Sequence, residues 1–239
     1  MIETFAALLL AHALADFVLQ TRTMVERKRE PLMLLLHGAI VLLTAQAALG
    51  QVVAWELLVL AAIHLAIDTA KTYLLPASLS TYLADQALHL VTLLALAALA
   101  PTLWAKGIWA DIPWMPSLML LLAGFIYTTR AGAFTIGFLI APWSDIELPK
   151  GLPNGGALIG TLERALIFLL VLVGQPAGIG FLIAAKSVLR FETTSKDQRA
   201  GEYVIIGTLA SFGWALLMTY ATVSLLQHLP PLGIAGMKP

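Results

Sequence analysis

Histidine and aspartate residues recur at a spacing of four along three apolar stretches of the chain. The pairs are His12 with Asp16, His64 with Asp68, and Asp85 with His89. Four residues make about one turn of an α-helix, so both members of a pair lie on one helical face. Neutral imidazole and carboxylate together bind Zn²⁺, Fe²⁺ or Mn²⁺. With His37 from a fourth stretch, the predicted metal ligands are His12, Asp16, His37, His64, Asp68, Asp85 and His89.

Seven ligands of this kind are enough for one divalent metal ion or for two. Two ions about 3.5–4 Å apart would polarise a phosphoryl or acyl oxygen and generate hydroxide at neutral pH. The same residues would also suit a relay for protons or ions, or a structural network in which each aspartate satisfies a histidine. A single pair would not separate these three roles, whereas three pairs and a fourth histidine favour the metal site.

Polar residues elsewhere in the chain are the candidates for handling a substrate. Glu163 is a candidate general acid or base, as is Asp85 of the ligand set. The candidates for binding an anionic substrate are Lys71, Gln86, Arg130, Arg164, Lys186 and Arg190. The lysines and Arg190 could instead extend toward the membrane surface. Arg130 lies too deep for that, so we expect it to have a partner or an anionic ligand.

The composition around these residues is that of a membrane protein. Of the 239 residues 59% are hydrophobic and only 12% are charged, with 14 basic and 14 acidic residues and no net charge. Soluble proteins are about half apolar and about a quarter charged. An ordinary globular domain, a disordered chain and a nucleic-acid-binding protein with a strong basic field are therefore excluded. The chain has no cysteine, which excludes disulfides, thiolate metal sites and cysteine nucleophiles.

Eight apolar stretches predict membrane-spanning helices, because a span needs about 20 apolar residues. They are residues 2–20, 31–49, 52–75, 80–100, 115–141, 155–173, 176–191 and 202–226. The stretch 176–191 is short, which makes seven spans the alternative, and 115–141 is long enough to be broken near Gly132. The predicted fold is therefore an all-α, polytopic transmembrane helix bundle. It forms a single integral membrane domain, 1–239, with the His/Asp motifs in 1–100 and the Glu/Arg/Lys motifs in 101–239.

Basic residues cluster after the first and the seventh predicted spans, and the positive-inside rule places both clusters in the cytoplasm. The clusters are Arg22, Arg27, Lys28 and Arg29, and then Arg190, Lys196 and Arg199. Both termini are then expected on the outer, periplasmic side, and no signal peptide is expected because the first span begins with Glu3 instead of basic residues. In this topology all seven predicted ligands fall at a similar depth, in the cytoplasmic halves of their spans.

Two pairs of glycines allow helices to approach one another closely. They are Gly156 with Gly160, and Gly174 with Gly178. Such pairs suit packing within the chain, and they also permit a homo-oligomer. Membrane lipid is the other expected partner.

Several motifs resemble those of a bacterial integral-membrane family, domain of unknown function 3307. In the first half these are His12-Ala-Leu-Ala-Asp16-Phe-Val-Leu-Gln20, His64-x-x-x-Asp68-x-x-Lys71 and Asp85-Gln86-x-x-His89. In the second half they are Gly160-Thr-Leu-Glu163-Arg164, Ala185-Lys186-Ser187-x-x-Arg190-Phe191 and the stretch from Glu202 to Ser211. The resemblance covers nearly the whole chain and implies a bacterial inner-membrane protein, but no particular activity. The H-x-x-x-D helix is also faintly similar to membrane-bound metal-dependent hydrolases.

The leading hypothesis is a metal-dependent membrane enzyme. We expect a hydrolase that acts on a lipid, a lipid-phosphate or a membrane peptide from the cytoplasmic side. One alternative is a transporter of an ion or a small anionic solute, and another is a structural or assembly subunit of a membrane complex. The predicted ligands lie nearer to the cytoplasmic face than to the middle of the membrane. This position disfavours a transporter, because transporters usually bind their substrates near the middle of the membrane.

Overall fold

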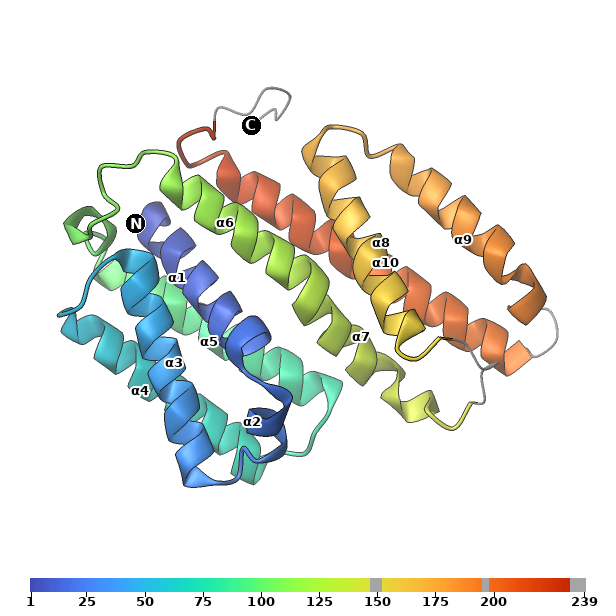
Figure 1. Ribbon diagram of the computed structural model, residues 1–239, viewed down its shortest axis with the longest axis horizontal. Coiled ribbons are helices and arrows are strands. Elements are labelled where there is room, and N and C mark those ends of the chain that lie inside the picture. The colour runs from blue at the N-terminus through green and yellow to red at the C-terminus, as the bar shows by residue number, and fades with distance from the viewer. Residues whose placement is uncertain (147–151, 195–197, 233–239) are drawn as a thin grey trace. The chain divides into compact units, whose positions relative to one another are not determined.

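In the computed structural model, which describes residues 1–146, 152–194 and 198–232, every regular element of the described chain is a helix (Figure 1). The α-helices are α1 (Ile2–Leu14), α2 (Arg22–Glu26), α3 (Pro31–Leu49), α4 (Trp55–Leu74), α5 (Leu79–Leu99), α6 (Met115–Ile126), α7 (Gly132–Ile140), α8 (Gly155–Leu172), α9 (Gly178–Thr194) and α10 (Gln198–Leu226). Two π-helical turns, Ala15–Leu19 and Tyr127–Ala131, continue α1 and α6. Short 3₁₀ turns occur at Trp104–Lys106 and Ala141–Trp143.

The predicted polytopic helix bundle is confirmed. Within the described residues, seven helices are long and apolar enough to cross a membrane. The remaining predicted span contains the apolar helical segment Gly178–Val188, which is shorter than a span, as its sequence suggested. The long stretch 115–141 lies within one continuous helical span, Met115–Trp143, so the expected break near Gly132 is replaced by the π-helical turn Tyr127–Ala131 just before this glycine.

The chain divides into two compact units, each of which is described by itself. The first unit contains residues 1–126 and 225–232. At its centre lies α1, whose residues from Thr4 to Ala13 are all buried. A helix that is apolar all round is expected to be buried in this way. Helices α3, α5 and α6 pack against α1, and α4 packs against both α3 and α5.

The second unit contains residues 127–224. Helix α8 packs against the π-helical turn Tyr127–Ala131, and also against α7 and α9. Its apolar core is formed by Ile167 of α8, Ile179 of α9, and Phe212 and Ala215 of α10. This packing fixes one face of α8 inside the unit.

A close backbone approach joins the segment after α5 to the turn between α3 and α4. Gly50 adopts a left-handed conformation with φ of 64°, which favours glycine. The Ile108 N–H donates to the Gly50 carbonyl at 3.2 Å, and the Trp109 indole N–H donates to the Ala47 carbonyl at 2.9 Å. A Cβ atom on Gly107 would lie 1.8 Å from the carbonyl oxygen of Leu49.

We therefore expect Gly107→Ala to destabilise the protein by about 3 kcal/mol or more, because the backbone of Leu49 must move to admit the methyl group. Thermal unfolding of the purified protein in detergent measures this effect. Gly137→Ala is the matched control, since a Cβ there meets no atom within 4 Å. An unchanged unfolding temperature for Gly107→Ala would contradict the close approach.

Candidate metal centre

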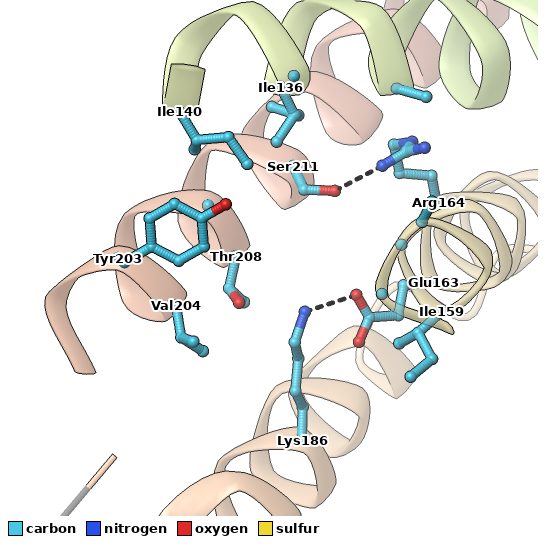
Figure 2. A pocket seen from close by; sticks show the side chains of 16 residues that line it. Ile136, Ile140, Ile159, Glu163, Arg164, Lys186, Tyr203, Val204, Thr208 and Ser211 are labelled. Atoms are coloured by element: carbon cyan, nitrogen blue, oxygen red, sulfur yellow. Dashed lines mark hydrogen bonds and ion pairs between the residues drawn. The ribbon is translucent and has the colours of Figure 1, made fainter. Parts of the chain in front are cut away.

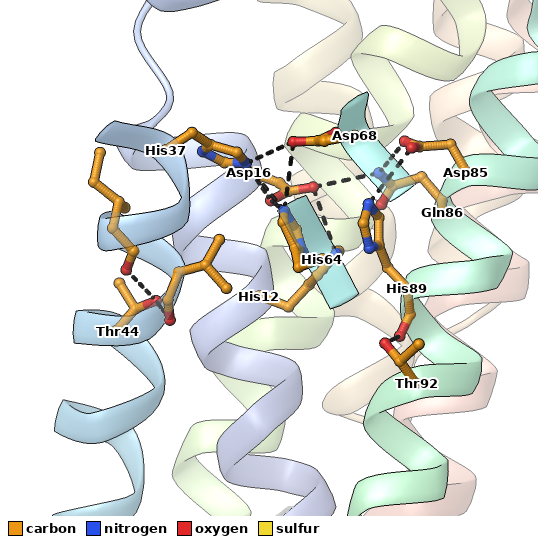
Figure 3. A network of polar contacts seen from close by, with 12 residues as sticks. His12, Asp16, His37, Thr44, His64, Asp68, Asp85, Gln86, His89 and Thr92 are labelled. Carbon is orange, nitrogen blue, oxygen red and sulfur yellow. Dashed lines mark hydrogen bonds and ion pairs between the residues drawn. The ribbon is translucent and has the colours of Figure 1, made fainter. Parts of the chain in front are cut away.

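All seven predicted metal ligands come together in the first unit, from four helices (Figure 3). Helix α1 and its π-helical turn supply His12 and Asp16, α3 supplies His37, α4 supplies His64 and Asp68, and α5 supplies Asp85 and His89. Each of the four histidines is at most 3% exposed. The three predicted i, i+4 pairs are all in contact, with nitrogen–oxygen distances of 3.5, 3.6 and 3.5 Å. We call these seven residues the histidine–aspartate cluster.

The tightest part of the cluster joins two imidazoles and two carboxylates. The Nε2 atoms of His37 and His64 are 3.1 Å apart. Asp16 Oδ1 lies 3.4 and 3.5 Å from these two nitrogens, and Asp68 Oδ2 lies 3.2 and 3.6 Å from them. Ligand atoms bound about 2.0–2.1 Å from a tetrahedral metal ion are about 3.3–3.4 Å apart. Each oxygen therefore forms, with the two nitrogens, a triangle the size of one face of such a coordination site.

Ligand atoms also converge in other parts of the cluster. One group consists of His12, His64 and His89, and another of Asp68, Asp85 and His89, with the ligand atoms of each group within 4.8 Å of one another. The imidazoles of His64 and His89 stack with their centroids 4.0 Å apart. These groups are further places in the cluster at which a metal ion could be held, and the number of ions stays a prediction.

Each of the three aspartates is held through one of its two oxygens by a cationic or amide group. Lys28 Nζ donates to Asp68 Oδ1 at 2.8 Å, and Lys71 Nζ donates to Asp85 Oδ2 at 2.6 Å. Gln86 Nε2 donates to Asp16 Oδ2 at 3.5 Å. Such outer partners are typical of metal-binding carboxylates, which they orient toward the ion.

The second oxygen of each aspartate is directed toward the histidines. Asp16 Oδ1, Asp68 Oδ2 and Asp85 Oδ1 are buried and have no hydrogen-bond partner in the described part of the chain. A buried acceptor without a donor costs free energy. The three carboxylates face the ammonium groups of Lys28 and Lys71 and the imidazoles of the cluster, and a divalent cation among them would satisfy the remaining oxygens.

Lys28 is a site residue that the sequence motifs do not identify. It lies in the turn between α2 and α3, and the topology assigned it only to a basic cytoplasmic cluster. Its side chain is 16% exposed and reaches Asp68. Its predicted depth in the membrane could have identified Lys28 as a site residue. The positive-inside rule places the basic cluster that contains Lys28 and the predicted ligands toward the same side of the membrane.

Asp16 lies in a π-helical turn, which the sequence also does not reveal. The turn ends where Gln20 N–H donates to the Ala15 carbonyl, five residues earlier, at 3.0 Å. Turns of this kind are rare and occur frequently at functional sites. The turn is therefore a second local feature that coincides with the histidine–aspartate cluster.

Lys71 and Gln86 were predicted to bind substrate, and the structure gives both of them contacts with cluster aspartates. Lys71 pairs with Asp85, and Gln86 Nε2 also lies 3.3 Å from Asp85 Oδ2. Both side chains can therefore orient carboxylates. A direct role in binding substrate stays a prediction.

Lys28→Met is expected to weaken binding of divalent metal by about 10–100-fold, because Asp68 then loses the partner that orients it. It should also lower the free energy of unfolding by about 3 kcal/mol, the cost of breaking a largely buried ion pair. Competition with a chromogenic chelator measures the affinity. Lys106→Met, at an exposed lysine, is the control. Unchanged affinity in a folded Lys28→Met protein would show that this ion pair does not support metal binding.

The predicted acid–base and anion-binding residues Glu163, Arg164 and Lys186 come together in the second unit. They line a pocket of about 350 Å³, in which Lys186 Nζ donates to Glu163 Oε2 at 2.6 Å (Figure 2). Arg130 is exposed on the π-helical turn, and the anionic partner expected for it stays a prediction. The side chain of Arg190 lies outside the described residues. A single site shared by these residues and the metal ligands stays a prediction as well.

Three of the four glycines in the predicted pairs have roles within the second unit. Gly156 and Gly160 line the pocket. A Cβ on Gly178 would lie 2.9 Å from Leu170, so this glycine lets α9 approach α8. A homo-oligomer formed through either pair stays a prediction.

The fold and the cluster define a class of protein, an all-helical membrane protein with a buried group of histidines and aspartates. Residues 4–109 match the model of the family described as protein of unknown function (DUF3307). The resemblance seen in the first-half motifs is thus confirmed, and the matched stretch contains the whole cluster and Lys28. The second-half motifs lie outside it. No curated protein and no solved structure matches the chain.

Proposed function

We propose that the first unit holds one or two divalent metal ions and that the protein is a metal-dependent membrane hydrolase. One observation carries the proposal: each cluster aspartate is held through one oxygen, and its other, buried oxygen lies 3.2–3.6 Å from imidazole nitrogens without accepting a hydrogen bond. A purely structural His–Asp network would instead be expected to use these oxygens as hydrogen-bond acceptors.

The donor set indicates which ions would bind. Imidazole nitrogen and carboxylate oxygen, without thiolate, suit Zn²⁺, Fe²⁺ and Mn²⁺. Such an ion would supply Lewis-acid polarisation of a substrate carbonyl or phosphoryl oxygen and would activate water at neutral pH. His37, His64, Asp16 and Asp68 are the proposed primary ligands, because their atoms form the two triangles of matching size.

Asp85 is the proposed general base. Lys71 fixes one Asp85 oxygen, while the other lies 3.5 Å from His89 Nε2. Lys71 is about 29% exposed and can also contact an anionic substrate group at the edge of the cluster. The proposed substrates are a lipid, a lipid-phosphate or a membrane peptide, because the cluster lies in helices apolar enough for the membrane.

We place the site on the cytoplasmic side of a bacterial inner membrane, with both termini in the periplasm. The ion pair between Lys28 and Asp68 supports this orientation, because it joins the predicted cytoplasmic basic cluster to the metal ligands.

The test uses full-length protein in vesicles of bacterial phospholipid that contain a hydrophobic reporter peptide, with added Zn²⁺ or Mn²⁺. Mass spectrometry of the lipids and the peptide should find hydrolysis products that depend on the metal and are lost in Asp85→Asn. Asp111→Asn, at an exposed aspartate, should retain activity. Metal-dependent ion flux without hydrolysis would overturn the hydrolase in favour of a transporter. Metal binding with neither activity would overturn it in favour of an assembly role.

A further inference from the structure

The pocket of the second unit contains a buried cation that the proposed metal centre does not use. Helices α7, α8, α9 and α10 line this pocket, which has a volume of about 350 Å³ (Figure 2). Its charged residues are Glu163, Arg164 and Lys186, and Ser211 adds a hydroxyl. The remaining wall is mainly apolar, with Ile136, Ile140 and Ile159 among its residues.

Arg164 is only 3% exposed, and its hydrogen bonds within the described residues all go to uncharged oxygens. Nε and Nη2 donate to the Thr129 carbonyl at 3.2 and 3.0 Å, Nη1 donates to Ser211 Oγ at 3.0 Å, and Nη2 donates to Thr161 Oγ1 at 3.4 Å. A guanidinium stays protonated in proteins. A buried charge without a paired anion is costly, and an anion beside it would recover that cost.

The nearby carboxylate does not fill this role by direct contact. Glu163 accepts from Lys186 at 2.6 Å, and this pair is a salt bridge of its own. Two cations and one carboxylate leave the pocket with a net charge of +1. The unbalanced charge matches a group that carries one negative charge.

The backbone around Arg164 is shaped to hold the guanidinium in place. The π-helical turn Tyr127–Ala131 presents the Thr129 carbonyl to it. A Cβ on Gly132 would lie 2.9 Å from Nε, and a Cβ on Gly160 would lie 3.2 Å from Nη1. Both glycines therefore keep space around the charge, and a group fixed in this way binds a ligand with little loss of conformational freedom.

We propose that this pocket binds the anionic group of a membrane amphiphile, a phosphate or a carboxylate, with Arg164 as its charge partner. Ser211 and Lys186 contact the same group, and the isoleucine wall contacts the first part of its apolar chain. Arginine suits this role because its planar fork matches both phosphate and carboxylate. The proposal is independent of the metal centre.

The test is titration calorimetry of the full chain in an uncharged detergent. The probes are dioctanoyl phosphatidic acid, dioctanoylglycerol, which lacks the phosphate, and inorganic phosphate, which lacks the chains. We expect the phosphatidic acid to bind at least about tenfold more tightly than either of the others. If inorganic phosphate binds as tightly as the phosphatidic acid, the pocket binds a free anion and the amphiphile proposal is overturned. If dioctanoylglycerol binds as tightly as the phosphatidic acid, the proposed role of Arg164 as charge partner is overturned.

Variants separate binding from folding. Gly156→Leu fills the pocket from a position where a Cβ meets no atom within 4 Å, and it should weaken binding at least about tenfold. Gly213→Leu, equally open and outside the pocket lining, should not. Glu163→Gln frees Lys186 and should tighten binding severalfold, which a misfolded protein would not do. Folded Gly156→Leu and Glu163→Gln proteins that bind like the unaltered chain would overturn the proposal.

The same titration with the chelator-treated protein distinguishes this proposal from the proposed function. Phosphatidic acid should bind unchanged without metal, so a failure of the metal centre leaves this result intact. Loss of binding on chelation would overturn the independence of the pocket.

Discussion

His64→Ala is expected to abolish tight binding of divalent metal while the protein stays folded. His64 Nε2 belongs to both triangles, since it lies 3.1 Å from His37 Nε2 and within 3.6 Å of the Asp16 and Asp68 oxygens. Loss of an outer partner of a metal ligand costs about 10–100-fold in affinity, so we expect loss of this ligand to cost more than about 100-fold. Competition between the protein and a fluorescent Zn²⁺ chelator measures the affinity.

The matched control is His228→Ala, which removes the one histidine outside the cluster, at an exposed position. It should bind metal like the unaltered protein. Thermal unfolding shows whether each variant is folded. A folded His64→Ala protein with undiminished affinity would mean that the triangles do not hold the metal.

Removal of the metal is expected to lower the unfolding temperature by about 5–10 °C. A ligand at 100 times its dissociation constant stabilises the folded state by about 2.7 kcal/mol, and 1 kcal/mol shifts the unfolding temperature by about 2–4 °C in a chain of this size. Without metal, one buried oxygen of each cluster aspartate accepts no hydrogen bond within the described residues. Tryptophan fluorescence during heating, with Zn²⁺ or with a chelator, measures the shift.

The His64→Ala protein provides the control for this experiment, because the chelator should have no effect on it. Equal unfolding temperatures of the unaltered protein with and without metal would contradict a link between the metal and the stability of the first unit. A chelator effect that persists in His64→Ala would show that the metal binds elsewhere.

The sequence predicts the ligands well because their signals are local. A spacing of four within an apolar helix places His12 beside Asp16 and His64 beside Asp68, whatever the packing. The similar depth of these residues within their predicted spans then favours a single cluster. Contacts between helices, such as the 3.1 Å between His37 and His64, depend on how side chains pack, and no pattern in one stretch contains that information.

The π-helical turns and the contacts that they allow are beyond the reach of sequence patterns. The segment Tyr127–Ala131 has the pattern of ordinary helix, yet its turn presents the Thr129 carbonyl that binds Arg164. The sequence predicts only that Glu163 and Arg164 point about 100° apart on their helix. Which of the two is buried is decided by the neighbouring turn and by the space at Gly132.

The most direct test of the metal centre is the metal content of the unaltered protein. Full-length protein is purified in detergent without chelator, and inductively coupled plasma mass spectrometry counts the metal ions per chain. We expect one or two ions of Zn, Fe or Mn per chain. A well-folded protein that carries none, and that takes up none when these ions are added, would contradict the metal centre.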